Sequence, residues 1–211
     1  YSTAQSIELT RDAERVGVDG IMLVTPYYNK PPQRALVEHF SAIAAATALP
    51  VILYNIPSRS ARNIEPDTVA ALSRVKNIVA IKEASGDMVQ VSRIRALAAS
   101  DFAIYSGNDT DTLPILSIGG IGVISVAGHL IPGMIKDMIE AYKSGHNTRA
   151  KDLHIRMMPL FDALFADTNP IPVKYAVSLM GLPAGPLRLP LVQVQDETAR
   201  RVREAMSGLG L

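Results

Sequence analysis

The sequence predicts an α/β protein built on a parallel sheet. Five apolar runs of strand length recur along the first two thirds of the chain: Gly20–Thr25, Val51–Asn55, Ile78–Lys82, Phe102–Gly107 and Gly122–Val126. Each run is apolar throughout, which is typical of strands in a parallel sheet that is covered on both faces. Helical patterns lie between the runs, so the order is βαβα, for which right-handed crossovers are expected.

Apolar residues at helical spacing mark the helices that accompany these strands. They predict helices over Ile7–Val16, Leu36–Ala44, Pro66–Ser73 and Met88–Leu97. Proline suits the first turn of a helix, as at Pro66, and an acidic residue such as Asp87 favours a helix start.

After Val126 the strand pattern ends and only helices are predicted. Their apolar stripes cover Met134–Tyr142, Leu153–Phe165, Val173–Met180 and Glu197–Met206. No linker or low-complexity segment interrupts the chain. We therefore expect one structural unit, with the α/β part in residues 1–130 and a helical part in residues 131–211.

The composition of the 211 residues excludes several classes of protein. Apolar residues make up 48% and charged residues 19%, which excludes a disordered chain. The net charge is +1 without blocks of like charge, so neither a nucleic-acid nor a membrane partner is expected. Cysteine is absent, which removes disulfides and thiolate chemistry and fits a reducing cytosol.

Functional side chains recur at the ends of successive strands. Tyr28 lies just past the first run, Tyr54 and Lys82 end the second and third, and Gly107 closes the fourth, at separations of 26, 28 and 25 residues. Such groups converge on one edge of a parallel sheet. In a (β/α)8 barrel this edge carries the active site, whereas an open doubly wound sheet binds at a switch point. Neither of the nucleotide-binding motifs G-x-G-x-x-G and G-x-x-x-x-G-K-[ST] is present, which disfavours the open doubly wound sheet.

Lys82 is the strongest candidate for chemistry. An ammonium group that ends an apolar strand is costly to desolvate, so its pKa should fall, and the neutral amine can attack a carbonyl to form a Schiff base. Strand alternation places Ile78, Ala80 and Lys82 on one face, opposite Glu83. The alternative is a lysine that reaches solvent from the strand end.

Three further residues have both a functional and a structural interpretation. Tyr54 could shuttle protons, or it could be a core tyrosine with a satisfied hydroxyl. Arg59 follows a proline turn and could bind a carboxylate through two hydrogen bonds, or it could be a surface arginine. Tyr28 belongs to an aromatic loop that suits either a subunit interface or simple packing.

Six segments together resemble the dihydrodipicolinate synthases, a family of the pyruvate-dependent class I aldolase superfamily. They are Val24–Asn29, Tyr54–Arg59, Ile81–Asp87, Ser106–Asp109, Gly122–Val126 and Asn169–Lys174. The resemblance extends over the whole chain in the order and spacing of the family. It implies a (β/α)8 TIM barrel with extra C-terminal helices, a homotetramer, a cytoplasmic location and the condensation of pyruvate with L-aspartate 4-semialdehyde.

The resemblance also implies roles for individual residues. Lys82 would form the pyruvate imine, Tyr54 would relay protons and Arg59 would bind the carboxylate of the semialdehyde. Tyr28 would enter the site of a neighbouring subunit, and the backbone at Gly107 and Ile124 would contact pyruvate. No metal or organic cofactor is implied, because the lysine imine itself serves as the electron sink.

The chain departs from the family pattern at its beginning. The family's first three βα units and a Thr-Thr-Gly-Glu motif are not found, so about five barrel strands are encoded. We therefore expect open sheet edges, poor solubility and negligible turnover for the 211-residue chain alone. Two alternatives follow: an aldolase for N-acetylneuraminate or 2-keto-3-deoxy sugar acids, and a catalytically incomplete barrel that serves only as an assembly module.

Overall fold

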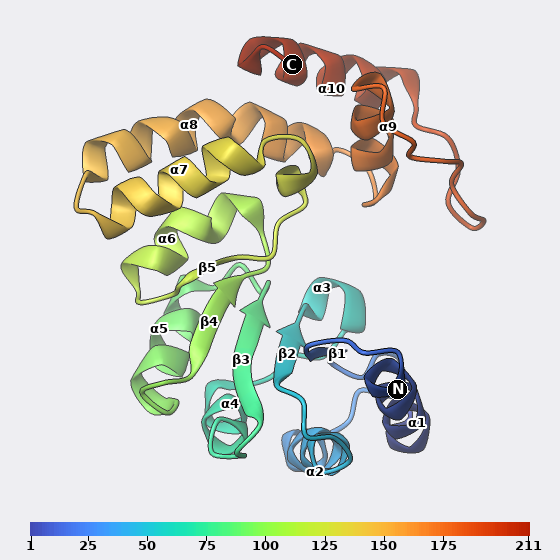
Figure 1. Ribbon diagram of the computed structural model, residues 1–211, viewed down its shortest axis with the longest axis vertical. Helices are drawn as coiled ribbons and strands as arrows, with labels where there is room; N and C mark the ends of the chain where they lie inside the picture. Colours follow the sequence, from blue (N-terminus) through green and yellow to red (C-terminus); the bar gives the residue numbers. More distant parts are fainter. The chain divides into compact units, whose positions relative to one another are not determined.

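A computed structural model describes residues 1–211 and divides them into two compact units, Tyr1–Ile124 and Ser125–Leu211 (Figure 1). All the candidate site residues named above belong to the first unit. The division into residues 1–130 and 131–211 stays a prediction.

The first unit is built on five parallel strands that lie side by side in chain order. They are β1 (Ile21–Val24), β2 (Val51–Asn55), β3 (Ile78–Glu83), β4 (Ala103–Ser106) and β5 (Gly122–Val123). The predicted α/β class and parallel sheet are thus confirmed. The sheet is open, since β1 and β5 are its two edges. A closed TIM barrel is therefore not confirmed, and the expected absence of its first three βα units is not borne out.

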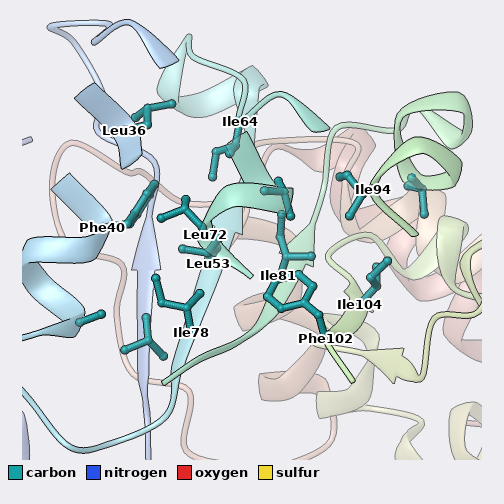
Figure 2. Packing of buried hydrophobic residues seen from close by; sticks show 14 of the residues in the cluster. Leu36, Phe40, Leu53, Ile64, Leu72, Ile78, Ile81, Ile94, Phe102 and Ile104 are labelled. Carbon is teal, nitrogen blue, oxygen red and sulfur yellow. The ribbon is translucent and has the colours of Figure 1, made fainter. Parts of the chain in front are cut away.

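Helices form a layer along this sheet, each beside the next (Figure 1). They are α1 (Thr3–Arg15), α2 (Gln33–Ala44), α4 (Pro66–Leu72), α5 (Met88–Leu97) and α6 (Thr112–Ser117); the short α3 (Pro57–Ser60) and η1 (Asp109–Asp111) follow strand ends. The hydrophobic core lies where the helices meet the sheet. Figure 2 shows Leu36 and Phe40 of α2 and Leu72 of α4 near Leu53 and Ile78 of the strands.

Only one face of the sheet is covered within this unit. Along β2 the side chains of Val51, Leu53 and Asn55 are buried, whereas Ile52 and Tyr54 are partly exposed. The prediction that the strands are covered on both faces is therefore wrong for this unit. Apolar residues also occupy the open face, as at Met22 and Val24 of β1, which explains why the runs show no alternation in sequence.

Strand β3 contains a one-residue irregularity. Val51 is paired with Ile78, but the next residue, Ile52, is paired with Ala80, so Val79 has no partner on β2. Ile78 consequently lies in the core cluster, away from the face that carries Lys82. The prediction that strict alternation places Ile78 with Lys82 is wrong, because the extra residue changes the phase of the strand.

The second unit is helical, as predicted. It consists of the short η2 (Ala127–His129) followed by α7 (Pro132–Lys143), α8 (Asn147–Leu164), α9 (Ile171–Leu179) and α10 (Asp196–Leu209). Helix α8 packs against α7 and α10, and α10 also packs against α9. Across both units, no helix is long and apolar enough to cross a bilayer.

Candidate active site

Three polar side chains stand in one row across the sheet. Tyr54 on β2 is paired with Lys82 on β3, and Lys82 is paired with Tyr105 on β4. All three are partly exposed, in contrast to the residues on the helix-covered face. Each belongs to the last two residues of its strand, so the row lies at the C-terminal edge, where parallel α/β proteins build their sites.

The amine of Lys82 lies against the ring of Tyr54. Its Nζ is 4.2 Å from the ring centroid, and the side chain is half-buried. Burial lowers the pKa of Lys82, while the carboxylate of Asp109 acts in the opposite direction. Desolvation is the larger effect, so the fraction of neutral, nucleophilic amine is higher than for a lysine in water.

The backbone of Tyr54 is fixed by Thr25, the residue that directly follows β1. Thr25 donates two hydrogen bonds to the carbonyl oxygen of Tyr54, one from its backbone N–H and one from Oγ1, both of 3.0 Å. Burial raises the pKa of Tyr54, and the charge of Arg59 opposes this shift. The phenol therefore remains protonated near neutral pH and can donate to an oxygen beside Lys82.

Arg59 approaches the row from the short helix α3, which directly follows β2. Proline at position 57 occupies the first position of this helix, and Ala61 ends it in the left-handed conformation with φ 57°. Arg59 is exposed, and its charge acts on Tyr54. An exposed guanidinium beside the row suits the binding of an incoming carboxylate.

Gly107 packs directly against the lysine. A Cβ atom at this position would lie 2.6 Å from the Cβ of Ala84 and 3.2 Å from the Cε of Lys82, so only glycine fits without displacement. The N–H of Gly107 donates to the backbone carbonyl oxygen of Glu83, and the N–H of Ile124 donates to the backbone carbonyl oxygen of Ser106. Any backbone contact of these two residues with a ligand must therefore come from their carbonyl oxygens.

Tyr28 is the one candidate residue that the structure leaves apart from the row. Its side chain is 88% exposed, and its φ of 70° is in the left-handed region. The neighbouring Tyr27 instead packs edge-to-face on Tyr1, with ring centroids 5.4 Å apart.

The sequence interpretation missed three features of this edge. Tyr105 joins the row because it is paired with Lys82, and its place two residues before Gly107 is visible in the sequence. Asp109 is almost completely buried, and its charge acts on the pKa of Lys82. The third feature is a buried pair, Asn55 and Glu83, behind the row. No group of three or more His, Asp or Glu side chains is arranged to hold a metal ion.

Comparisons with known proteins identify the family. A model of the dihydrodipicolinate synthetase family matches residues 1–209. The 4-hydroxy-tetrahydrodipicolinate synthase of Moorella thermoacetica is 51% identical over 210 residues, which are 100% of this chain and 72% of that protein.

Solved structures agree with this assignment. The dihydrodipicolinate synthase of Cyanidioschyzon merolae, determined with lysine bound, matches with a TM-score of 0.97 and 47% identity, covering 100% of this chain and 72% of the other. The chloride-inhibited enzyme of Acinetobacter baumannii, determined with pyruvate, matches with a TM-score of 0.94 and 37% identity, covering 99% and 72%. The α/β fold and the match over nearly the whole chain define the class of protein, an α/β enzyme. This chain belongs to the dihydrodipicolinate synthetase family.

Proposed function

We propose that this chain is a 4-hydroxy-tetrahydrodipicolinate synthase, a lyase of lysine biosynthesis that joins pyruvate to L-aspartate 4-semialdehyde. One observation carries the proposal: a half-buried lysine amine with a lowered pKa lies 4.2 Å from a tyrosine ring at the C-terminal edge of the sheet. Curated relatives at about 50% identity carry this name, so neither the sugar-acid aldolase nor the assembly module is favoured.

Lys82 supplies the nucleophile in this mechanism. Its neutral Nζ attacks the keto carbon of pyruvate, and the resulting carbinolamine loses water to give an imine. The imine nitrogen withdraws electrons, so the methyl carbon gives up a proton and becomes an enamine. The enamine carbon then attacks the aldehyde of the second substrate. The amino group of that substrate afterwards replaces the amine of Lys82 at the imine carbon, which releases the product from the enzyme. Because the imine is the electron sink, the chemistry needs neither a metal nor an organic cofactor.

The neighbouring residues move protons and orient the substrates. The phenol of Tyr54 donates a proton to the departing hydroxyl of the carbinolamine and accepts one during enamine formation. Arg59 binds the carboxylate of the semialdehyde. The carbonyl oxygens of Gly107 and Ile124 border the space for pyruvate.

The quaternary arrangement and the barrel belong to the same proposal. Strands that follow one another in chain order without a switch point are typical of a (β/α)8 barrel, and this supports an assignment of β1–β5 as consecutive barrel strands. An exposed aromatic at positive φ supports a role for Tyr28 at the interface of a homotetramer, where it would complete the relay of a neighbour. We place the enzyme in the cytoplasm.

Reductive trapping tests the proposed function. Borohydride added in the presence of pyruvate should attach the reduced pyruvyl group to Lys82, as located by peptide mass mapping. Lys82→Ala should abolish labelling because it removes the amine. Lys82→Arg should abolish it as well, because a guanidinium stays protonated at any working pH. Lys174→Arg is the matched control, since the amine of Lys174 donates to the carbonyl oxygen of Pro186 in the second unit. A label on Lys174 with Lys82 unmodified would contradict the mechanism.

A second measurement separates the two aldolase activities. The rate at which the pyruvate imine is consumed should rise on addition of aspartate semialdehyde. Preferential cleavage of N-acetylneuraminate or of a 2-keto-3-deoxy sugar acid would instead assign the chain to the alternative activity.

A further inference from the structure

A polar pair lies on the helix-covered face, directly behind the lysine and the tyrosine. Asn55 follows Tyr54 and Glu83 follows Lys82 in the chain, and their exposed fractions are 0% and 1%. The Nδ2 of Asn55 donates to both carboxylate oxygens of Glu83, at 3.1 and 3.0 Å. The C-terminal ends of β2 and β3 are therefore joined by buried side chains as well as by the backbone ladder.

The pair continues into a network that reaches two more elements. Asn55 also donates to the Oδ1 of Asn63, at 2.8 Å. Asn63 and Gln90 exchange two hydrogen bonds of 2.7 and 3.1 Å, and Gln90 donates to Glu83 at 3.3 Å. Asn63 lies between α3 and α4, while Gln90 lies in the first turn of α5. Four segments around the candidate site thus meet in one buried cluster.

The hydrogen bonds of this network have a fixed direction. Glu83 accepts from Asn55, from Gln90, and from both the hydroxyl and the backbone N–H of Ser85, the last at 2.7 Å. The side-chain amide of Asn55 cannot turn over, because its Oδ1 already accepts from the N–H of Ile64 at 3.0 Å. A glutamine at position 83 would place an N–H donor against an N–H donor of a neighbouring residue. Turning over the side-chain amide of Asn63, of Gln90 or of the new glutamine only moves this conflict to another contact.

We infer that this network is the positioning device of the site, and that Glu83, Asn55, Asn63 and Gln90 hold Lys82 over Tyr54 and fix the segment that follows Arg59. None of the four lies on the open face, so they are positioning residues and not catalytic ones. The carboxylate that acts on the pKa of Lys82 is Asp109, so Glu83 works through geometry. The inference rests on the proposed function only where it concerns imine formation.

Substitutions at position 83 test whether the network acts by positioning Lys82. Glu83→Gln creates the donor conflict, whereas Glu83→Asp keeps a carboxylate, which only accepts hydrogen bonds. Asn77→Ala is the control. It deletes three hydrogen bonds, from Nδ2 to the carbonyl oxygens of Ala44, Thr47 and Leu49, at the opposite end of β3.

Two readouts report on the site. The first is the ring-current shift of the Lys82 Cε protons, measured by NMR without substrate, which reports the amine's position over the Tyr54 ring. The second is the rate of borohydride-trapped imine formation at saturating pyruvate. Thermal unfolding of each variant gives its stability.

Glu83→Gln should lose most of the ring-current shift and slow trapping by about tenfold or more, since small displacements of reacting groups are costly. Glu83→Asp should retain more of the shift than Glu83→Gln and keep trapping within about threefold of the wild type. Asn77→Ala should lower the unfolding temperature and change neither readout. If Glu83→Gln does not fold, Asn63→Ser, which shortens one side chain of the network, should reduce the shift in the same direction.

Other results would overturn the inference. Equal losses of the shift in Glu83→Asp and Glu83→Gln would mean that the acceptor at position 83 does not position the lysine. An unchanged shift in Glu83→Gln or Asn63→Ser would mean that the network serves only stability. A wild type that shows the shift but traps no pyruvate would refute the proposed function, while the series of shifts would still decide the role of the network.

Discussion

At the scale of single residues, the reactivity of Lys82 depends on two opposing influences. Burial lowers the pKa of its amine, and the nearby carboxylate of Asp109 raises it. Because the neutral amine is the nucleophile, the trapping rate should increase with pH until the pKa of Lys82 is passed. Asp109→Asn removes the opposing influence, so the pKa of Lys82 should fall further.

The expected result is a rate profile for Asp109→Asn that is displaced to lower pH. The profile is measured as the rate of imine trapping against pH at saturating pyruvate. Asp111→Asn, at an acidic position two residues away, is the control. A profile displaced to higher pH would show that Asp109 does not act on Lys82 as described.

The same buried lysine should reduce stability. Its native pKa is lowered, so the native state binds fewer protons than the unfolded chain. The penalty is complete below the native pKa and disappears above the unfolded value of about 10.4. Lys82→Met should therefore be more stable than the wild type in urea unfolding at pH 7, and the advantage should shrink as the pH approaches 10. A constant advantage would indicate a packing effect instead.

Gly107 should be intolerant of even one methyl group. A Cβ there would lie 3.1 Å from the carbonyl oxygen of Glu83 and closer still to Ala84. We expect Gly107→Ala to cost about 1–3 kcal/mol of unfolding free energy through overpacking. Because the methyl group also presses on Lys82, the rate of imine trapping should fall. Gly133→Ala, where no atom lies within 4 Å, is the control, and equal losses in both variants would contradict this account.

At the scale of elements, the helix that carries Arg59 ends on a strained residue. Ala61 closes α3 at φ 57°, a conformation that costs a residue with a Cβ about 1–2 kcal/mol. Glycine adopts it freely, although it also loses more entropy on folding. Ala61→Gly should therefore stabilise the chain by up to about 1 kcal/mol, measured as a higher urea midpoint with an unchanged slope. A lower midpoint would show that neighbouring contacts relieve the strain.

The elements themselves were largely predictable from the sequence. The strands agree with the predicted runs to within a few residues, because a short run of apolar, β-branched residues bounded by polar turns favours a strand over other secondary structure. The row of Tyr54 and Lys82 was also predictable, since parallel strands end at a common edge. Their spacing along the chain is sufficient for that inference.

Partnerships within the buried face were not predictable. Glu83 was predicted only to lie on the face opposite Lys82. In the structure it accepts hydrogen bonds from residues up to 28 positions distant. Burial raises the pKa of Glu83, and the hydrogen bonds from Ser85, Asn55 and Gln90 oppose that shift. Such compensation needs three-dimensional partners, which a one-dimensional pattern does not contain. The extra residue in β3 was missed for the same reason, because only pairing with β2 reveals it.

At the scale of the whole molecule, the uncovered face of the sheet should govern behaviour in solution. Met22 and Val24 of the edge strand β1 are 47% and 41% exposed on that face. An open edge beside exposed apolar side chains favours association between chains. We expect the 211-residue chain to self-associate, as seen in concentration-dependent sedimentation.

A charge on the exposed face should weaken this association. Met22→Lys should shift the sedimentation profile toward smaller species, whereas Ile155→Lys adds the same charge to an exposed position of α8 and should not. Equal effects of both substitutions would assign the change to net charge alone. A monodisperse wild-type monomer would show that the face does not self-associate.

Val79 makes the length of β3 adjustable at one point. Because this residue has no partner on β2, its deletion would leave Ile78 in the core and Lys82 beside Tyr54, now joined by an uninterrupted strand. Deletion of Ile81 would also preserve the orientation of the lysine, but it would put Ala80 where a fully buried isoleucine packs. The strand can thus lose a residue before the site without turning the nucleophile inward. A shortened chain that lacks Val79 should still form the pyruvate imine.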